Sequence, residues 1–344
     1  MARTRIALAG LGAAARTIHL PALAKLKDVE VVGGFDPAGE LPGVRSFASL
    51  EEMLIVGKPD VVTIATPPSS HLAIAAAALE AGAHVFCEKP LAATLAEADA
   101  LSDVARRCGR RVAVNSEFPY MPIHSAARDE IGSERFGRLL FVDIRQSFVM
   151  TSDTEAGWRG NELQRSFKEF GTHVLDLCKF FFDERPTTMR SRMPRPFAGG
   201  GPDYLDLVQL DFSSDRVAQI TLDRLTRGRH SYLDIRLVGE KGTIETSIGG
   251  RAELTLGLRP QGRRPFSDLD LALGGRARLY HGDRHVTLAR SPLDLFPDAT
   301  ARLYRAFLEA IRHDRETPNG LDESRHTLQL LYDCYAGAAG AGSK

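Results

Sequence analysis

A glycine-rich turn near the start of the chain constrains its fold more than any other feature. Residues 6–9 form a short apolar run, and the sequence GLGAAA follows directly at residues 10–15. Gly10 would permit a tight turn, Gly12 would let a phosphate group approach the backbone, and Ala15 would let a helix pack closely on the strand. The free amides at the start of that helix would face the phosphate. The turn therefore predicts the strand, loop and helix that begin a dinucleotide-binding fold.

The order of apolar runs over the first 115 residues indicates a parallel sheet. Each run is short, apolar and bounded by turn residues, as strands are. Capping boxes that begin at Ser49 and Thr94 predict helices between the runs. Strands that are apolar throughout and alternate with helices form parallel sheets covered on both faces. The five expected strands are residues 6–9, 29–35, 61–65, 84–87 and 112–115.

A different pattern begins after about Phe118. Residues 139–149 and 205–248 contain runs that alternate apolar and polar side chains, which is typical of antiparallel strands with one covered face. Segments 185–202 and 257–276 are rich in proline, glycine and arginine and are expected to be loops. Two amphipathic helices are expected near the end of the chain.

These patterns predict an α/β chain of two domains, which also suits a length of 344 residues. Residues 1–120 are expected to form a Rossmann dinucleotide-binding domain. Residues 121–344 are expected to form an α+β domain with mostly antiparallel strands, and its last helix would be able to pack back on the first domain.

Charge and cysteine content argue against several classes of protein. The 44 basic side chains balance 44 acidic ones, whereas a dedicated nucleic-acid binder carries a basic surplus. The four cysteines lie far apart, which favours a reduced cytoplasmic protein without a metal site. There is no apolar stretch long enough for a transmembrane helix. The apolar run after Arg5 resembles a secretory signal, but two glycines interrupt it and Arg16 and His19 follow.

A carboxylate at the end of the second expected strand bears on the choice of cofactor. Asp36 stands 24 residues beyond Gly12, in the region where an acidic residue hydrogen-bonds the ribose hydroxyls of NAD. It would repel the 2′-phosphate of NADP, and no Arg or Lys follows it before Arg45. NAD is therefore favoured over NADP. The alternative is a surface turn with a solvated aspartate.

Polar side chains also follow the third, fourth and fifth expected strands. In a doubly wound sheet these carboxyl ends line the ligand crevice, so the residues there are candidates for cofactor contacts. Any one of them is also compatible with a capping or solvated role, and for His71 that interpretation is equally good. The expected cofactor-binding residues are Gly10, Leu11, Gly12, Ala13, Ala14, Asp36, Thr66, Pro67, His71, Glu88, Lys89 and Asn115.

The chain resembles the Gfo/Idh/MocA family of oxidoreductases, which includes glucose–fructose oxidoreductase and inositol dehydrogenase. The resemblance spans nearly the whole chain, and its most specific part is E-K-P followed later by G-x-H-x-x-D. It implies a Rossmann domain followed by a domain with a large open sheet, which commonly forms the interface of a homodimer or homotetramer. The motifs that carry it are GLGAAA at 10–15, ATP at 65–67, FCEKP at 86–90, WR at 158–159, GTHVLD at 171–176 and VGEKGTI at 238–244.

The resemblance implies hydride transfer between NAD and a hydroxyl or keto group of a sugar, polyol or sugar derivative. It places Lys89 beside the nicotinamide, in contact with substrate, with His173 as a second acid–base residue. Glu169 is expected to belong to the catalytic residues and to contact substrate as well. Trp158 and Arg159 are expected near the cofactor, with Arg159 also contacting substrate.

The segment before His173 departs from the family pattern. Most relatives carry Asp four residues before the histidine, where this chain has Glu169, and the usual glycines are replaced by LQRSFK at 163–168. On an α-helix from about 167 to 182, Glu169, His173 and Asp176 would share one face. Spacing alone favours an ordinary surface row, and Asp176 is expected to be structural or orienting. The departure weakens any transfer of a particular sugar specificity and leaves open whether the hydride chemistry is preserved.

Three alternatives remain open from the sequence. Arg145, Arg159 and Arg165 are compatible with a carboxylate or phosphate on the substrate, or with a plain arginine-rich surface. An NAD-retaining hydrolase or epimerase-like enzyme would use hydride transfer only transiently. A non-catalytic NAD-binding regulatory protein would share the fold without the reaction.

Overall fold

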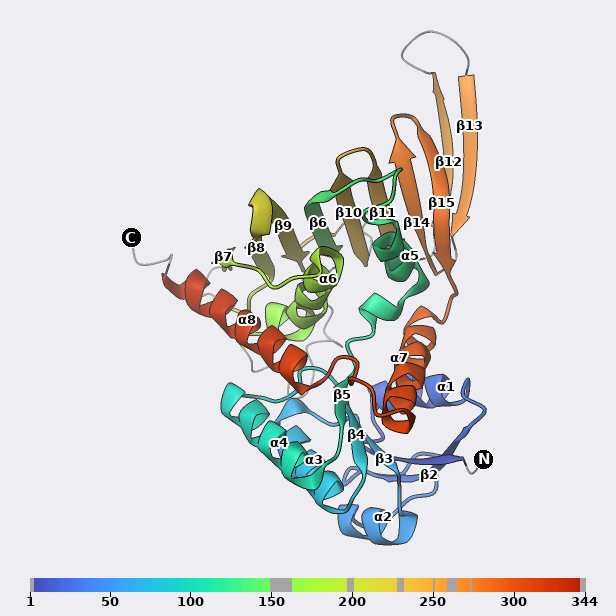
Figure 1. Cartoon of the computed structure of the whole chain (residues 1–344), viewed down its shortest axis with the longest axis vertical. Coiled ribbons are helices and arrows are strands. Elements are labelled where there is room, and N and C mark those ends of the chain that lie inside the picture. Colours follow the sequence, from blue (N-terminus) through green and yellow to red (C-terminus); the bar gives the residue numbers. More distant parts are fainter. Residues whose placement is uncertain are drawn as a thin grey trace. The chain divides into compact units, whose positions relative to one another are not determined.

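The structure is a computed structural model of the whole chain, which folds into two compact units (Figure 1). The first unit comprises Met1–Tyr120 and Phe296–Asp333, and the second comprises Met121–Leu295 and Cys334–Lys344. Between 251 and 272 only the backbone is described. The described residues are 3–148, 163–196, 201–227, 232–249, 251–258, 265–272 and 274–340.

The first unit contains a five-stranded sheet in the order β2-β1-β3-β4-β5. All four neighbouring pairs are parallel, and the strands β1, β3, β4 and β5 are largely buried. The predicted Rossmann-type sheet is therefore confirmed. The strands are β1 (Thr4–Ala9), β2 (Val29–Phe35), β3 (Val61–Ile64), β4 (His84–Cys87) and β5 (Val112–Val114).

Both predicted helix starts in the first unit are capped as expected. The Ser49 hydroxyl accepts a hydrogen bond from the Glu52 amide at 3.0 Å, and Thr94 forms a full capping box with Glu97. The helical elements of this unit are η1 (Ala15–His19), α1 (Leu20–Leu23), α2 (Leu50–Gly57), η2 (Pro68–Ser70), α3 (His71–Glu80), α4 (Leu95–Cys108), η3 (Phe118–Tyr120), α7 (Leu295–Arg312) and most of α8 (Leu321–Gly340).

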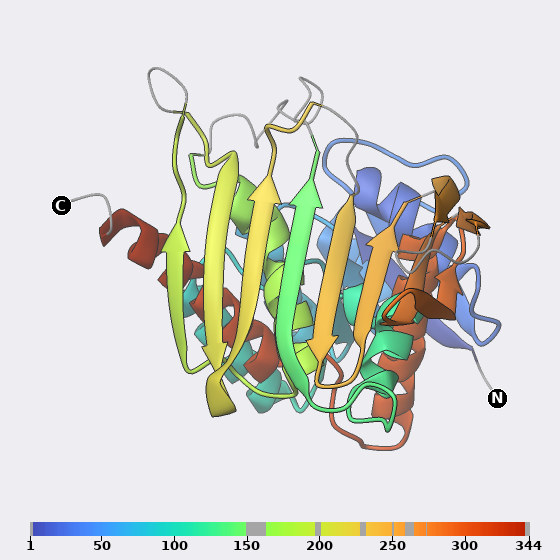
Figure 2. The same cartoon turned by 90° about the horizontal axis from the view of Figure 1, so that it is seen from above.

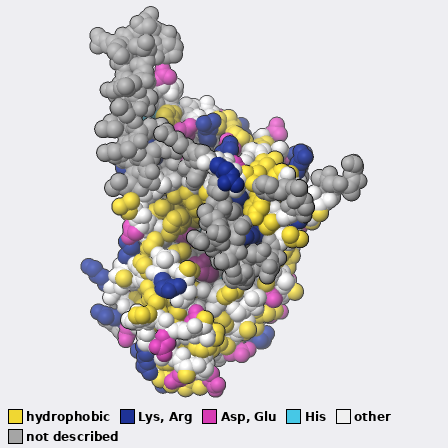
Figure 3. Space-filling model, turned by 180° about the vertical axis from the view of Figure 1, so that it is seen from behind, with side chains coloured by type: hydrophobic (Ala, Val, Ile, Leu, Met, Phe, Trp, Pro, Cys, Tyr) yellow, Lys and Arg dark blue, Asp and Glu magenta, His cyan; other side chains and the backbone are white. Residues whose placement is uncertain are grey.

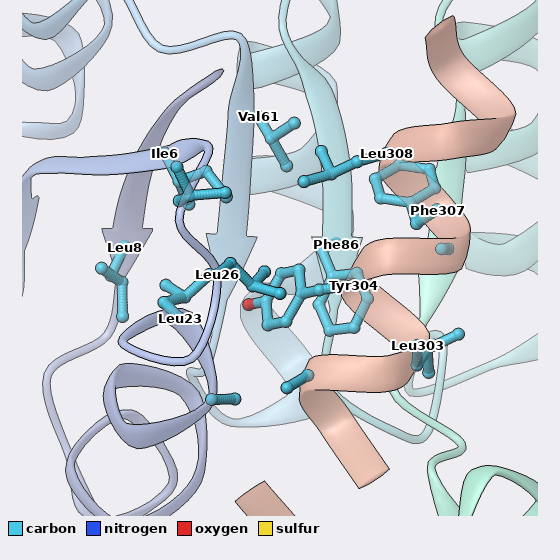
Figure 4. Close-up of a cluster of buried hydrophobic side chains, with 14 of the residues drawn as sticks. Ile6, Leu8, Leu23, Leu26, Val61, Phe86, Leu303, Tyr304, Phe307 and Leu308 are labelled. Carbon is cyan, nitrogen blue, oxygen red and sulfur yellow. The ribbon is translucent and has the colours of Figure 1, made fainter. Parts of the chain in front are cut away.

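Helix α7 completes the core of the first unit (Figure 4). Its Tyr304 ring stacks on Phe86 of β4, with centroids 3.8 Å apart, and Phe307 packs beside them. These rings lie in one cluster with Ile6 and Val61 of the neighbouring strands. Burial of a large apolar side chain contributes about 1.5–3 kcal/mol, so α7 is an integral part of this fold.

The second unit is built on an eight-stranded sheet in the order β15-β14-β11-β10-β6-β9-β8-β7 (Figure 2). Its pairs are antiparallel except for β6 and β9, which run parallel. The predicted large, mostly antiparallel sheet is confirmed. Its strands are β6 (Leu139–Ser147), β7 (Thr188–Arg192), β8 (Leu205–Phe212), β9 (Arg216–Asp223), β10 (Leu233–Gly239), β11 (Thr243–Ile248), β14 (Gly275–His281) and β15 (Arg284–Ser291).

Helices α5 (Pro122–Glu130) and α6 (Thr172–Phe182) cover one face of this sheet, and α6 is preceded by the π-helical turn η5 (Phe167–Gly171) (Figure 2). Along β8 every second side chain is buried, as the alternating sequence predicts. A further antiparallel pair joins β12 (Arg251–Leu258) to β13 (Pro265–Ala272).

The loop prediction for 185–202 and 257–276 is wrong in part, because β7 and β13 lie within these segments. In β7 the side chains are half-buried or exposed. Because no face of this strand is buried, its sequence lacks the apolar and polar alternation by which a strand is recognised. A strand of this kind is held by its backbone hydrogen bonds to β8.

Among the described residues, no helix is long and apolar enough to cross a membrane. All four cysteines are free thiols. On the face shown in Figure 3, the Lys and Arg side chains drawn in colour are interspersed with Asp and Glu rather than joined in one basic surface.

Candidate functional site

The two glycines of the turn after β1 differ in whether the fold itself requires a glycine. Gly10 has a φ of +93°, and a Cβ there would lie 2.7 Å from the carbonyl atoms of Ala65. A Cβ on Gly12 would meet no atom within 4 Å among the described residues. The fold itself requires Gly10, whereas the space beside Gly12 is open.

The carboxylate of Asp36 is fixed against this turn. Its Oδ2 accepts a hydrogen bond from the amide of Leu11 at 2.8 Å, and its Oδ1 accepts one from the amide of Ala38 at 2.8 Å. Each carboxylate oxygen has a second lone pair, so Asp36 can still accept hydrogen bonds from hydroxyl groups. The glycine turn and the end of β2 are therefore joined through the Asp36 carboxylate, which has a fixed orientation.

The helix after the turn begins as the motif predicts. Ala15 is fully buried, which allows close packing, while Ala13 is exposed and Ala14 half-exposed. The first turn is π-helical and continues directly into α1. The backbone at the start of this helix is therefore accessible at the turn.

Glu88, at the end of β4, is the centre of a polar network in the first unit. Its Oε1 lies 2.9 Å from Nε2 of His19 and accepts a hydrogen bond from Nδ2 of Asn115 at 2.8 Å. Burial opposes the charge of Glu88, but the hydrogen bond and charge of His19, the charge of Lys89 and the Asn115 amide lower its pKa to about 2. Glu88 is therefore ionised at neutral pH.

Helix α7 supplies the outer part of this network. The Tyr304 hydroxyl lies 3.0 Å from Nδ1 of His19 and 2.7 Å from Oγ1 of Thr63. The Thr300 hydroxyl donates to Oδ1 of Asn115 at 3.3 Å. No sequence pattern links His19, Thr63 and Tyr304, because they lie on three separate elements, η1, β3 and α7.

His71 joins the loops that follow β3 and β4. Its ring is fully buried, with Nε2 2.9 Å from the carbonyl oxygen of Thr66 and Nδ1 3.0 Å from that of Pro90. The Cys87 sulfur lies 3.3 Å from Nδ1, and burial raises the pKa of this thiol well above its ordinary value. A neutral imidazole carries one N–H, so the ring donates either to Thr66 through Nε2 or to Pro90 through Nδ1. These contacts fit the capping role that the sequence left open for His71 beside a cofactor contact.

Lys89, Thr66 and Pro67 complete the predicted residues at the strand ends. Lys89 is half-buried, its amide donates to Oε2 of Glu88 at 3.2 Å, and its peptide bond to Pro90 is cis. The Thr66 hydroxyl accepts a hydrogen bond from Ser70 at 2.7 Å, and Pro67 is exposed. Within the first unit the structure thus places the predicted residues at the carboxyl ends of the strands.

In the second unit, Glu169 and His173 lie on consecutive helical segments. Glu169 is half-buried within η5, and His173 is 6% exposed at the start of α6. A π turn joins residues five apart, so the α-helical spacing expected between Glu169 and His173 does not hold through η5. Asp176 forms an ion pair with Lys179, with Oδ1 and Nζ 3.2 Å apart.

Arg224 is a second buried arginine of this region, besides Arg165, and it was not among the three expected from the sequence. Its guanidinium lies 3.9 Å from the centroid of Phe148 and 4.2 Å from that of Phe170, and it donates to Gln146 at 2.9 Å. Burial lowers the pKa of Arg224 to about 10, which leaves it cationic at neutral pH. Because Arg224 stacks on Phe170, its positive charge lies against the residue that follows Glu169 in the chain.

The expected arginines have other surroundings. The Arg145 side chain is 61% exposed, and its Nη2 lies 3.5 Å from Oδ2 of Asp223. Arg165 is buried. Trp158 and Arg159, both expected near the cofactor, lie outside the described residues.

The family comparisons agree with this architecture. The model described as "Oxidoreductase family, NAD-binding Rossmann fold" matches residues 4–116, and the GFO/IDH/MocA C-terminal domain matches residues 124–245. The chain therefore belongs to the GFO/IDH/MocA oxidoreductase family, as the sequence motifs predicted.

Individual relatives match this chain at low sequence identity. A levoglucosan dehydrogenase from Pseudarthrobacter phenanthrenivorans is 28% identical over 232 residues, which cover 58% of this chain and 59% of that protein. An inositol 2-dehydrogenase from Acidothermus cellulolyticus is 27% identical over 280 residues, covering 76% of this chain and 78% of that protein. The match to the first relative thus spans less than two thirds of its length.

Solved structures share the fold over the whole chain. An oxidoreductase from Agrobacterium radiobacter, determined in complex with NAD+, L-tartaric acid and magnesium, superposes with a TM-score of 0.80 at 17% identity. That match covers 98% of this chain and 97% of the other. At this identity the likeness shows the fold alone.

Proposed function

We propose that the protein is an NAD-dependent oxidoreductase that transfers a hydride between nicotinamide and a hydroxyl or keto group of a sugar, polyol or sugar derivative. The observation that carries the proposal is the glycine turn with Asp36 fixed against it, in a chain of this family. Relatives named as dehydrogenases of levoglucosan, D-apiose and inositol support a carbohydrate substrate.

NAD fits the turn better than NADP. The open space at Gly12 suits a pyrophosphate, and the two amide hydrogen bonds hold Asp36 as an acceptor for ribose hydroxyls. A 2′-phosphate would meet this fixed negative charge. NAD would supply the hydride acceptor, and the residues proposed to hold it are Gly10, Leu11, Gly12, Ala13, Ala14, Asp36, Thr66, Pro67, His71, Glu88, Lys89, Asn115, Trp158 and Arg159.

Oxidation of a hydroxyl also requires a group that takes its proton. We assign proton handling and substrate contact to Lys89 and His173, and substrate contact to Glu169 and Arg159. Glu88 supports Lys89 from the adjacent position, because the network around it keeps the carboxylate charged and oriented.

The finer properties of the protein are also proposals. The eight-stranded sheet, with α5 and α6 on one face, supports assembly into a homodimer or homotetramer through the other face. The four free thiols support a cytoplasmic location. Size-exclusion chromatography with light scattering would test the assembly.

The direct test follows the absorbance of reduced nicotinamide across a panel of sugars, polyols and sugar acids. We expect turnover with NAD, and Lys89→Ala and His173→Ala to lower kcat about 10²–10⁴-fold, the usual contribution of an acid–base group. Activity that survives both substitutions would contradict the site assignment. Bound NAD that cycles without net reduction would instead indicate the hydrolase or epimerase-like alternative.

A separate test addresses the cofactor. Asp36→Ala removes the fixed carboxylate, so the ratio of affinities for NAD and NADP should shift toward NADP in titrations monitored by calorimetry. Wild-type protein that binds NADP more tightly than NAD would overturn the role given to Asp36.

A further inference from the structure

A buried carboxylate holds the start of the helical segment that carries Glu169 and His173. Asp203 is 1% exposed, and its Oδ1 accepts hydrogen bonds from the amides of Arg165 at 2.6 Å and Ser166 at 2.9 Å. Its Oδ2 accepts a third from the amide of Phe167 at 3.2 Å. The first amides of a helix have no partner within the helix, and an anion there is favourable. A residue 38 positions further along the chain therefore caps this segment.

A tyrosine extends the cap to the next amide. The Tyr335 hydroxyl donates to Oδ2 of Asp203 at 2.6 Å and accepts a hydrogen bond from the amide of Lys168 at 2.9 Å. Burial and the charge of Asp203 raise the pKa of Tyr335 well above its usual range, so the hydroxyl keeps the proton that it donates. Asp203 and Tyr335 thus accept hydrogen bonds from four successive amides, those of residues 165–168. We call this pair of residues the Asp203–Tyr335 clamp.

The interior of the π turn is fixed by packing. The Tyr335 ring meets the Phe167 ring edge-on, with centroids 6.0 Å apart and an interplanar angle of 85°. On the other side a Cβ at Gly171 would lie 2.9–3.1 Å from atoms of the Phe167 ring, so only glycine lets that ring lie so close. The π turn is held at its amides by the clamp and in its interior by Phe167.

We propose that Asp203 and Tyr335 are positioning residues that set the direction of Glu169 relative to His173; this inference rests on the function proposed above. Neither residue is assigned a contact with substrate. Their role is to hold η5 as a π turn, because relaxation to α-helical spacing would rotate Glu169 about the helix axis relative to His173. A displacement of about 1 Å at a reacting group can lower a rate about 10²-fold.

Tyr335→Phe tests the clamp most selectively, because it keeps the ring against Phe167 and removes only the hydroxyl. We expect kcat on the best substrate of the panel to fall about 10–100-fold while KM for NAD stays unchanged. Asp203→Asn, which keeps one oxygen acceptor, should retain more activity than Asp203→Ala. The matched control is Thr94→Ala, which removes a helix cap from α4, where no proposed site residue lies.

A second readout does not need turnover. The change in the pKa of His173 on Glu169→Gln, followed by NMR, measures the electrostatic coupling between the two side chains. We expect Tyr335→Phe to alter this coupling and Thr94→Ala to leave it as in the wild type. If the wild type oxidises no compound of the panel, the proposed function fails, while this titration still decides the role of the clamp.

The proposal is overturned if folded Tyr335→Phe protein keeps the wild-type coupling between Glu169 and His173. It is equally overturned if Tyr335→Phe lowers kcat no more than Thr94→Ala does. Should the Asp203 variants fail to fold, Tyr335→Phe alone decides between these outcomes.

Discussion

Glu88 in the first unit and Asp206 in the second are both carboxyl groups in poorly hydrated surroundings, yet their pKa values move in opposite directions. Glu88 lies against His19 and Asn115, which lower its pKa to about 2 despite burial. For Asp206, burial and the neighbouring charge of Asp203 raise the pKa well above its usual range. The comparison shows that the partners, and not burial alone, decide whether a buried carboxyl is an anion.

The first unit thus carries a charged carboxylate whose partners are side chains from separate elements. In the second unit the partners of Asp203 are mostly backbone amides, and Asp206, whose pKa is raised, lies beside it. Side-chain partners can be removed one at a time by substitution, whereas backbone amides cannot. The two regions should therefore respond differently to substitution and to pH.

The largest effect is expected from His19→Leu, which keeps much of the volume but removes the ring nitrogens that face Glu88 and Tyr304. Breaking a buried pair leaves an uncompensated charge, so the free energy of unfolding should fall by about 3–5 kcal/mol. Urea denaturation would measure it. Arg106→Ala is the control, because its ion pair with Asp103 is exposed and should contribute at most about 1 kcal/mol. If His19→Leu lowers the free energy of unfolding no more than Arg106→Ala does, the contact between His19 and Glu88 does not stabilise the fold as expected.

A smaller effect is expected in the dependence of stability on pH. A carboxyl whose pKa is lowered in the folded state stabilises the protein above its unfolded pKa, and this stabilisation is lost as the pH falls. For Glu88 the window runs from pH 4.5 down to about 2 and corresponds to about 3 kcal/mol. Denaturation at a series of pH values should show a shallower decline for Glu88→Gln than for the wild type. Parallel declines would contradict an ionised Glu88.

The smallest effect is expected from Asp206→Asn, and its sign is opposite. With a raised pKa, the folded state holds a proton that the unfolded state releases, so Asp206 lowers stability as the pH rises above 3.8. The amide is neutral at every pH, and the melting temperature near pH 7 should rise by about 2–4 °C, which corresponds to about 1 kcal/mol. Calorimetry at pH 7 and pH 4 would check this, since the gain should shrink at the lower pH. A lower melting temperature at pH 7 would mean that Asp206 is charged.

The fold of the first unit could be predicted because its signals are local. The glycine turn, the apolar strands and the cap at Thr94 each depend on residues close together in sequence, and each has the expected structure. The contribution of Tyr304 and Phe307 to this core could not be predicted in the same way. An amphipathic pattern shows that a helix has an apolar face but does not show which core that face joins.

The proposed site residues of the second unit were predictable only in part. The family motif singles out His173 and Glu169, whereas the amides at the start of the segment that carries them are bound by Asp203 and Tyr335. These partners come from distant positions in the chain, so no local pattern contains them. Arg224 escaped notice for a related reason, because its cage of Phe148 and Phe170 forms only when the strands and η5 come together.

The parallel pairing of β6 with β9 has a consequence for how the second unit folds. In this pair Phe141 lies opposite Val217, so the chain between them must complete a long excursion before the centre of the sheet can close. That excursion contains η5, α6, β7 and β8. Contacts between such distant positions form late and slow the folding of a domain. The segment that carries Glu169 and His173 therefore lies within this excursion, and the proposed site should form in the same kinetic step that closes the sheet.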